Sequence, residues 1–163
     1  MTTRLLRSAL FATLLVGSLA PAASAATDVH IEGHFTQHFG GRNGELAPCP
    51  NGEVICGTGR VEGYGAATDA FIDVDGELQY AFTLADGSSI TLAFEFVSAE
   101  TPGVSGETHG ATMSFGNPVV ITLDAFVIGS TGQFAGATGT GTLTLHNVGN
   151  VDQITVALDL DLP

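Results

Sequence analysis

Three histidines recur at every fourth position near the start of the sequence, at His30, His34 and His38. On a helix this spacing would give a metal-binding face, but the apolar residues between them alternate and predict a strand. On a strand, residues four apart are separated by about 13 Å, too far for two imidazoles to share one zinc ion. A metal would need a same-face pair, His30 with Glu32 or Glu32 with His34, and a ligand from a neighbouring strand. The simpler interpretation is a solvated polar face.

A second group of oxygen ligands is formed by Asp73, Asp75 and Glu77. Calcium prefers several carboxylate oxygens, so this segment is a candidate cation site. It lacks the twelve-residue spacing and terminal Glu of an EF-hand. Asp75-Gly76 is also typical of a tight hairpin, which explains the segment without an ion.

Candidates for acid–base or ligand chemistry are few, and no G-x-S-x-G, H-E-x-x-H or C-x-x-C motif occurs. His109 and Tyr80 alternate with apolar residues, which places both on an inner face. An imidazole facing an apolar interior can transfer protons, although a hydrogen-bonded core histidine is the commoner case. Arg60 and Tyr64 are candidates for contacting a ligand carboxylate, the alternative being that Arg60 pairs with Glu62.

The first 25 residues predict a cleaved secretory signal. Arg4 and Arg7 precede an apolar run over 9–20, and Ala23-Ser24-Ala25 offers a cleavage site. The alternative, a membrane anchor, is disfavoured because the run is shorter than the roughly 20 residues that span a bilayer. We therefore expect a secreted, extracellular protein with one domain over 26–163.

Two cysteines, Cys49 and Cys56, lie in the exported part and bracket the turn-forming residues 50–52. Export, an even count and a turn between them favour a disulfide over a two-thiolate metal site. No cofactor is expected.

The charge balance excludes several partners, because 4 basic residues face 17 acidic ones and lysine is absent. Nucleic-acid binding and binding to anionic membranes both depend on basic side chains. A 44% hydrophobic composition with 13% charged residues predicts a folded domain. A homo-oligomer is left open.

Apolar residues alternate along most of the exported part, as in half-buried strands. Inward side chains of two central strands are expected at Leu78, Tyr80, Phe82 and Leu84, and at Ile90, Leu92, Phe94 and Phe96. Tight turns are predicted at Asp75-Gly76 and Asp86-Gly87. The expected strands lie at 29–39, 59–74, 77–84, 90–96, 108–116, 118–128, 139–148 and 153–162. This pattern predicts an all-β fold, an antiparallel barrel of about eight strands, with a β-sandwich as the alternative.

Glycine forms a weak repeat, T-G-x-hydrophobic-x-G, at 58–63 and 131–136. Glycines inside strands mark bulges, bends or close backbone approach, which closing a barrel requires. The predicted structural glycines are Gly59, Gly63, Gly132, Gly136 and Gly139.

The segment Phe126–Leu143, FVIGSTGQFAGATGTGTL, resembles the G-x-T-G-x-F-x-G-A-x-G segment of the allene oxide cyclase and dirigent-protein barrel superfamily. It is also similar to secreted bacterial proteins of unassigned function. The resemblance implies an eight-stranded antiparallel barrel with an apolar cavity, and a trimer in the plant members. It covers only this segment and carries over no catalytic residue.

Three functions follow as hypotheses. The preferred one is a secreted acidic barrel that binds a small hydrophobic molecule without catalysis, or serves as a stable extracellular scaffold. The second is a cyclase- or dirigent-type enzyme that guides a reactive hydrophobic intermediate by confinement. The third is a calcium-binding surface protein. A barrel filled by Phe35, Phe82, Phe94, Phe96 and Leu158 would exclude both small-molecule hypotheses, whereas an open cavity lined by His109 and Tyr80 would support them.

Overall fold

A computed structural model describes residues 26–38, 49, 55–100, 119–148 and 151–163. Residues 1–25, where the signal is predicted, lie outside the described residues. The elements are β1 (Thr27–His38), β2 (Ile55–Val61), β3 (Gly65–Val74), β4 (Glu77–Leu84), β5 (Ser89–Glu100), β6 (Val119–Ser130), the 3-10 helix η1 (Gly132–Phe134), β7 (Thr138–Val148) and β8 (Val151–Leu162).

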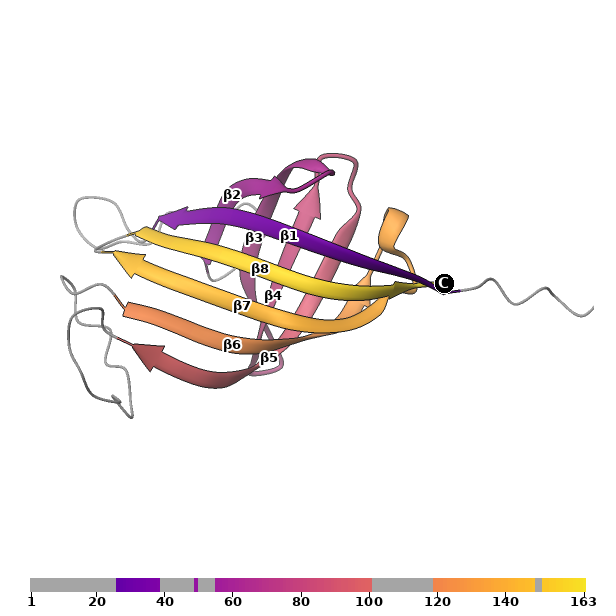
Figure 1. Ribbon diagram of the computed structural model, residues 1–163. Coiled ribbons are helices and arrows are strands. Elements are labelled where there is room, and N and C mark those ends of the chain that lie inside the picture. Colours follow the sequence, from indigo (N-terminus) through magenta and orange to yellow (C-terminus); the bar gives the residue numbers. More distant parts are fainter. Residues whose placement is uncertain (1–25, 39–48, 50–54, 101–118, 149–150) are drawn as a thin grey trace, which may run out of the picture.

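The strands form a closed barrel in which each strand pairs antiparallel with the next in sequence (Figure 1). The sheet closes where β1 pairs with β8 in an unbroken register from Thr27↔Leu162 to His38↔Val151. Closure confirms the predicted barrel and rules out the sandwich alternative. It also removes the sheet edges that would otherwise invite aggregation at this seam.

The two predicted Asp-Gly turns are confirmed. Asp75 and Gly76 both have positive φ, 56° and 88°, as a two-residue hairpin of the I′ type requires. The Gly76 amide donates to Asp73 Oδ1 at 2.9 Å, so this carboxylate stabilises the turn. At the second turn, the Gly87 amide donates to the Leu84 carbonyl at 3.0 Å.

The predicted strand over 59–74 is wrong in one respect, because it is two strands. A turn at 62–64 separates β2 from β3, and the Tyr64 amide donates to the Val61 carbonyl at 3.1 Å to close it. Gly63 makes this turn possible with φ of 75°. The predicted strand over 108–116 lies outside the described residues.

The predicted disulfide between Cys49 and Cys56 is present, with a Cα–Cα distance of 5.8 Å. Cys56 belongs to β2, so the bridge ties Cys49 to the barrel wall.

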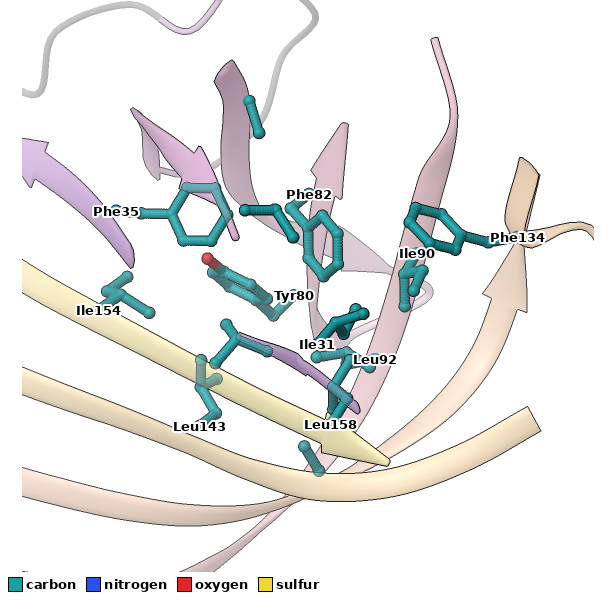
Figure 2. Close-up of a cluster of buried hydrophobic side chains, with 14 of the residues drawn as sticks. Ile31, Phe35, Tyr80, Phe82, Ile90, Leu92, Phe134, Leu143, Ile154 and Leu158 are labelled. Carbon is teal, nitrogen blue, oxygen red and sulfur yellow. The ribbon is translucent and has the colours of Figure 1, made fainter. Parts of the chain in front are cut away.

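The T-G-x-F-x-G segment closes one end of the barrel. Phe134 of η1 is 1% exposed and packs against Tyr64, with ring centroids 5.2 Å apart. Figure 2 shows Phe134 at one end of the buried cluster, beside Ile90. The Gln133 amide donates to Ser88 Oγ at 3.0 Å, which fixes η1 to the turn between β4 and β5. Gly132 is required here because its φ is 61° and a Cβ would collide with Ser88.

Inward glycines let neighbouring strands bend tightly around the small interior. A Cβ on Gly59 would collide with the His34 carbonyl of β1, one on Gly139 with the Asp159 carbonyl, and one on Gly141 with the Ala157 carbonyl. The second glycines of the two repeats, Gly63 and Gly136, both have positive φ. The first ones differ, since Gly59 lies inside β2 whereas Gly132 begins η1.

No helix in the described part of the chain has the length and apolar character needed to cross a membrane.

We expect Gly141→Ala to lower the free energy of unfolding by about 2–4 kcal/mol, because the new methyl group meets backbone that cannot move aside. Gly129→Ala on β6 is the matched control. Its Cβ would meet Thr91 at an ordinary 3.6 Å, so a change within about 0.5 kcal/mol is expected. Urea unfolding followed by circular dichroism measures both. Equal stability of the two variants would contradict the role given to Gly141.

Candidate functional site

A buried polar cluster joins three strands inside the barrel: Gln37 of β1, Asp69 of β3 and Tyr80 of β4. Their exposed fractions are 0%, 3% and 0%. Gln37 Nε2 donates to Asp69 Oδ2 at 2.7 Å, and the Tyr80 hydroxyl donates to the same oxygen at 2.9 Å. Alternation places each of these side chains inward, beside Phe35, Phe71 and Phe82 respectively. An ionisable group is thereby held among aromatic rings.

Two acceptor oxygens of this cluster lack a donor. Asp69 Oδ1 and Gln37 Oε1 are buried, and neither receives a hydrogen bond from the described residues. Unpaired buried oxygens cost free energy, so native proteins rarely keep them without a reason. Gly57 of β2 lies between them in register, opposite Gln37 on one side and Asp69 on the other. A Cβ there would come within 2.6 Å of Asp69 Oδ1 and 2.7 Å of Gln37 Cγ.

The surroundings change the acidity of Asp69. Burial disfavours its charged form and raises its pKa from 3.8 to about 6, although the hydrogen bonds from Tyr80 and Gln37 act in the opposite direction. Burial also raises the pKa of Tyr80, and the neighbouring Asp69 carboxylate adds to the effect. Asp69 therefore changes charge near pH 6, whereas the Tyr80 phenol stays protonated.

A second buried carboxylate, Asp152 of β8, lies opposite Gln37 in the β1–β8 register. It is 1% exposed, and Asn147 Nδ2 of β7 donates to its Oδ1 at 2.7 Å. Burial raises the pKa of Asp152, and the Asn147 hydrogen bond opposes this. The strand register thus places buried polar side chains side by side around the barrel. We call this group the polar belt; it consists of Asn147, Asp152, Gln37 and Asp69. The belt lies near the ends of β1 and β7 and the start of β8.

Contacting aromatic rings lead away from the polar belt. Tyr80 meets Phe35 and Phe71 edge to face, with centroid distances of 6.2 and 5.1 Å. Phe71 in turn meets Phe94 at 5.9 Å. Figure 2 shows the rings of Phe35, Tyr80 and Phe82 gathered in the interior. These buried rings pack on one another and surround one acidic group with apolar surface.

The strand pairing is weakest between β4 and β5, where only Tyr80↔Leu92 to Thr83↔Ser89 are in register. Leu78 shares a strand face with Tyr80, and Phe96 lies opposite the buried Leu123 of β6, so both belong to the inner face. They are nevertheless 46% and 63% exposed. We call Leu78, Phe94 and Phe96 the inner-face patch.

Leu78 and Phe96 thus have the inward position predicted for them, but neither side chain is buried. The reason is that β4 does not pair with β5 beyond Leu92, and a register shift follows Phe96. Of the five residues whose filling of the barrel would exclude a small-molecule ligand, Phe35, Phe82 and Leu158 are buried, with 3%, 1% and 0% exposure, and Phe94 is half-buried, whereas Phe96 is exposed.

The histidine group predicted from the sequence lies on the outer face of β1. His30 Nδ1 is 2.8 Å from Asp159 Oδ1 of β8, and His34 Nε2 is 3.3 Å from Glu32 Oε1. The residues that the structure describes contain no group of three or more His, Cys, Asp or Glu placed to hold a metal ion. The acidic hairpin of Asp73, Asp75 and Glu77 is exposed, and Asp73 is engaged by the turn itself.

The other residues predicted as site candidates lie in different parts of the protein. Tyr80 belongs to the polar cluster, whereas Tyr64 packs on Phe134 at the opposite end of the strands. Arg60 is exposed and lines an open groove of about 410 Å³ on the outside of β1, β2 and β8, together with His34 and Thr155. His109 lies outside the described residues.

Sequence reasoning missed Gln37, Asp69, Asn147 and Asp152. The sequence does contain a signal for these four residues, because each of them alternates with inward apolar residues. Asp69, for example, stands between Ala67 and Phe71, which are both buried. An acidic or amide residue at an inward position of an alternating strand therefore indicates a buried polar group.

Comparison with known proteins gives no match for this chain among protein-family models, curated proteins or solved structures.

Replacing Asp69 by Asn should stabilise the protein at neutral pH. The pKa of Asp69 is about 6 in the folded protein and 3.8 in the unfolded chain, so ionising Asp69 lowers the free energy of unfolding by about 3 kcal/mol. This loss of stability is absent below pH 4 and complete above pH 6. An amide at position 69 carries no charge and can donate to Gln37 Oε1. We expect the stability of the wild type to fall from pH 4 to pH 7 relative to Asp69→Asn.

Thermal unfolding across this pH range measures the difference. Asp124→Asn, which removes an exposed carboxylate from β6, is the matched control and should keep the wild-type profile. Parallel profiles for the wild type and Asp69→Asn would show that Asp69 titrates normally.

Proposed function

We propose that this protein is a secreted, non-catalytic barrel that binds a small hydrophobic molecule at the inner-face patch. The observation that carries the proposal is the exposure of Leu78 and Phe96, at 46% and 63%, on the inner face of a barrel whose remaining core is buried. Large apolar side chains left exposed on an inner face indicate a surface that serves an interaction.

The patch is continuous with the buried aromatic core. Phe94 of the patch contacts Phe71, which contacts Tyr80, and the Tyr80 hydroxyl binds Asp69. The rings of Phe71 and Tyr80 are buried and packed on one another, so a bound molecule would rest on the patch with the aromatic core beneath it. Contact with apolar side chains gives affinity through burial.

Catalysis of the cyclase or dirigent type is the less favoured alternative. A carboxyl group with a pKa of about 6 in an apolar site is able to act as a general base. Its neighbour Tyr80 has its pKa raised above 10 and is a poor proton donor at neutral pH. The cluster thus offers one catalytic group where acid–base chemistry usually employs two.

Secretion rests on the signal-like residues 1–25 and on the Cys49–Cys56 disulfide, which forms in oxidising compartments. Membership of the allene oxide cyclase and dirigent-like superfamily rests on the residues of 126–143. Thr131, Gly132 and Phe134 serve in that segment to close the barrel, in keeping with a structural motif.

Binding of the neutral dye Nile red tests the proposed site. We expect one saturable site per chain, and we expect Leu78→Glu to weaken binding at least about tenfold, because a buried carboxylate without a partner is costly. Ile128→Glu is the matched control, since Ile128 is 52% exposed but lies on the outer face of β6. Its affinity should stay within about twofold of the wild type.

Native mass spectrometry of protein purified from its own host's medium complements this test, with a co-purifying hydrophobic ligand as the expected result. Nile red affinity that is equal in the two glutamate variants, or absent in the wild type, would overturn the proposed site.

A further inference from the structure

The two buried oxygens that lack a donor belong to the two partners of one hydrogen bond. Gln37 Nε2 donates to Asp69 Oδ2 at 2.7 Å, and the unpaired atoms are Gln37 Oε1 and Asp69 Oδ1, the second heteroatoms of the same two groups. Both side chains border Gly57, where a Cβ would lie 2.6 Å from Asp69 Oδ1 and 2.7 Å from Gln37 Cγ. Asp69 Oδ1 therefore lies close to the Gln37 side chain.

A single proton can satisfy both oxygens. A protonated carboxyl group has one O–H donor, whereas a carboxylate has none. With a proton on Oδ1, Asp69 donates to Gln37 Oε1 while Gln37 Nε2 still donates to Asp69 Oδ2. Carboxyl and amide groups are planar, so a shared plane aligns the two hydrogen bonds side by side. A proton also needs no extra space, which the close packing around Gly57 does not offer.

The existing hydrogen bonds indicate which oxygen carries the proton. Asp69 Oδ2 accepts from Gln37 Nε2 and, at 2.9 Å, from the Tyr80 hydroxyl, whereas Oδ1 accepts no hydrogen bond. Both donors stabilise electron density on Oδ2, so the proton belongs on Oδ1.

The groups packed around Asp69 favour its neutral form. They are Gln37 of β1, Gly57 of β2, Ala67 and Phe71 of its own strand, and Tyr80 and Phe82 of β4, with Asp152 of β8 opposite Gln37. Among these described groups only Tyr80 and Asp152 titrate, and neither carries a positive charge. Burial raises the pKa of Asp69 to about 6, which acts in the same direction.

We propose that the folded protein binds a proton on Asp69 Oδ1 and shares it with Gln37 Oε1, so that carboxylic acid and amide form a closed pair. The pair joins β1 to β3, which have no backbone pairing because β2 lies between them. It is a pH-sensitive connection: protonation closes it, and ionisation leaves one hydrogen bond, a buried charge and an unpaired amide oxygen. This inference does not depend on ligand binding at the inner-face patch.

Nuclear magnetic resonance tests for the shared proton. At pH 5 we expect a slowly exchanging carboxylic acid proton in the wild type, with nuclear Overhauser effects to the Nε2 hydrogens of Gln37. This resonance should disappear as the pH rises through 6, and it should be absent from Asp69→Asn. Asp152→Asn removes the other buried carboxyl group and is the matched control, so it should keep the resonance.

Hydrogen exchange of the β2 amides measures the strength of the connection. Local opening exposes Asp69 to water, where its pKa returns to 3.8, so opening becomes easier as the pH rises. After correction for intrinsic exchange, protection of Gly57 and Thr58 in the wild type should fall about tenfold from pH 5 to pH 7.5. Asp69→Asn pairs amide with amide and should show no fall, whereas Asp124→Asn should behave as the wild type.

The ¹³C signal of the Asp69 carboxyl group separates the possible outcomes. A neutral Asp69 at pH 5 without an Overhauser effect to Gln37 would overturn the shared proton and leave the raised pKa standing. An ionised Asp69 at pH 5 would overturn both. A shared proton combined with pH-independent protection of β2 would overturn the pH-sensitive connection between β1 and β3.

Discussion

Closure of the sheet between β1 and β8 is the constraint on which the remaining structure depends. The two strands pair along their whole lengths, and this seam joins the first strand of the barrel to the last. Closure gives every inward side chain one shared interior. Residues far apart in sequence, such as Gln37, Asp69 and Asp152, therefore become neighbours on consecutive or next-but-one strands.

A small closed interior explains the placement of glycine. Where strands bend most, a Cβ on Gly59 or Gly141 would strike the backbone of the adjoining strand, so these positions exclude other residues. Gly57 has a further consequence, because its missing side chain lets Gln37 of β1 reach Asp69 of β3 across β2. The same feature that permits curvature thus permits a polar contact between strands that do not pair.

The interior of the barrel is covered completely in some places and left exposed in others. Phe134 fills the end where β8 finishes, while β4 and β5 share a short register and leave Leu78 and Phe96 exposed. A buried carboxylate with a raised pKa and an unpaired amide oxygen lower stability further. Local instability of this kind is expected where a protein keeps an interaction available instead of optimising its own fold.

The sequence by itself determined the all-β alternation, the two Asp-Gly turns and the Cys49–Cys56 bridge, because each depends on residues close together in the chain. It also contained the inward position of Asp69, visible between Ala67 and Phe71. Only the tertiary structure decided that Asp69 meets Gln37 and Tyr80, since strand register brings them together and burial then raises the pKa of the carboxyl group. It likewise decided that Phe96 is exposed, because that depends on where β4 stops pairing with β5.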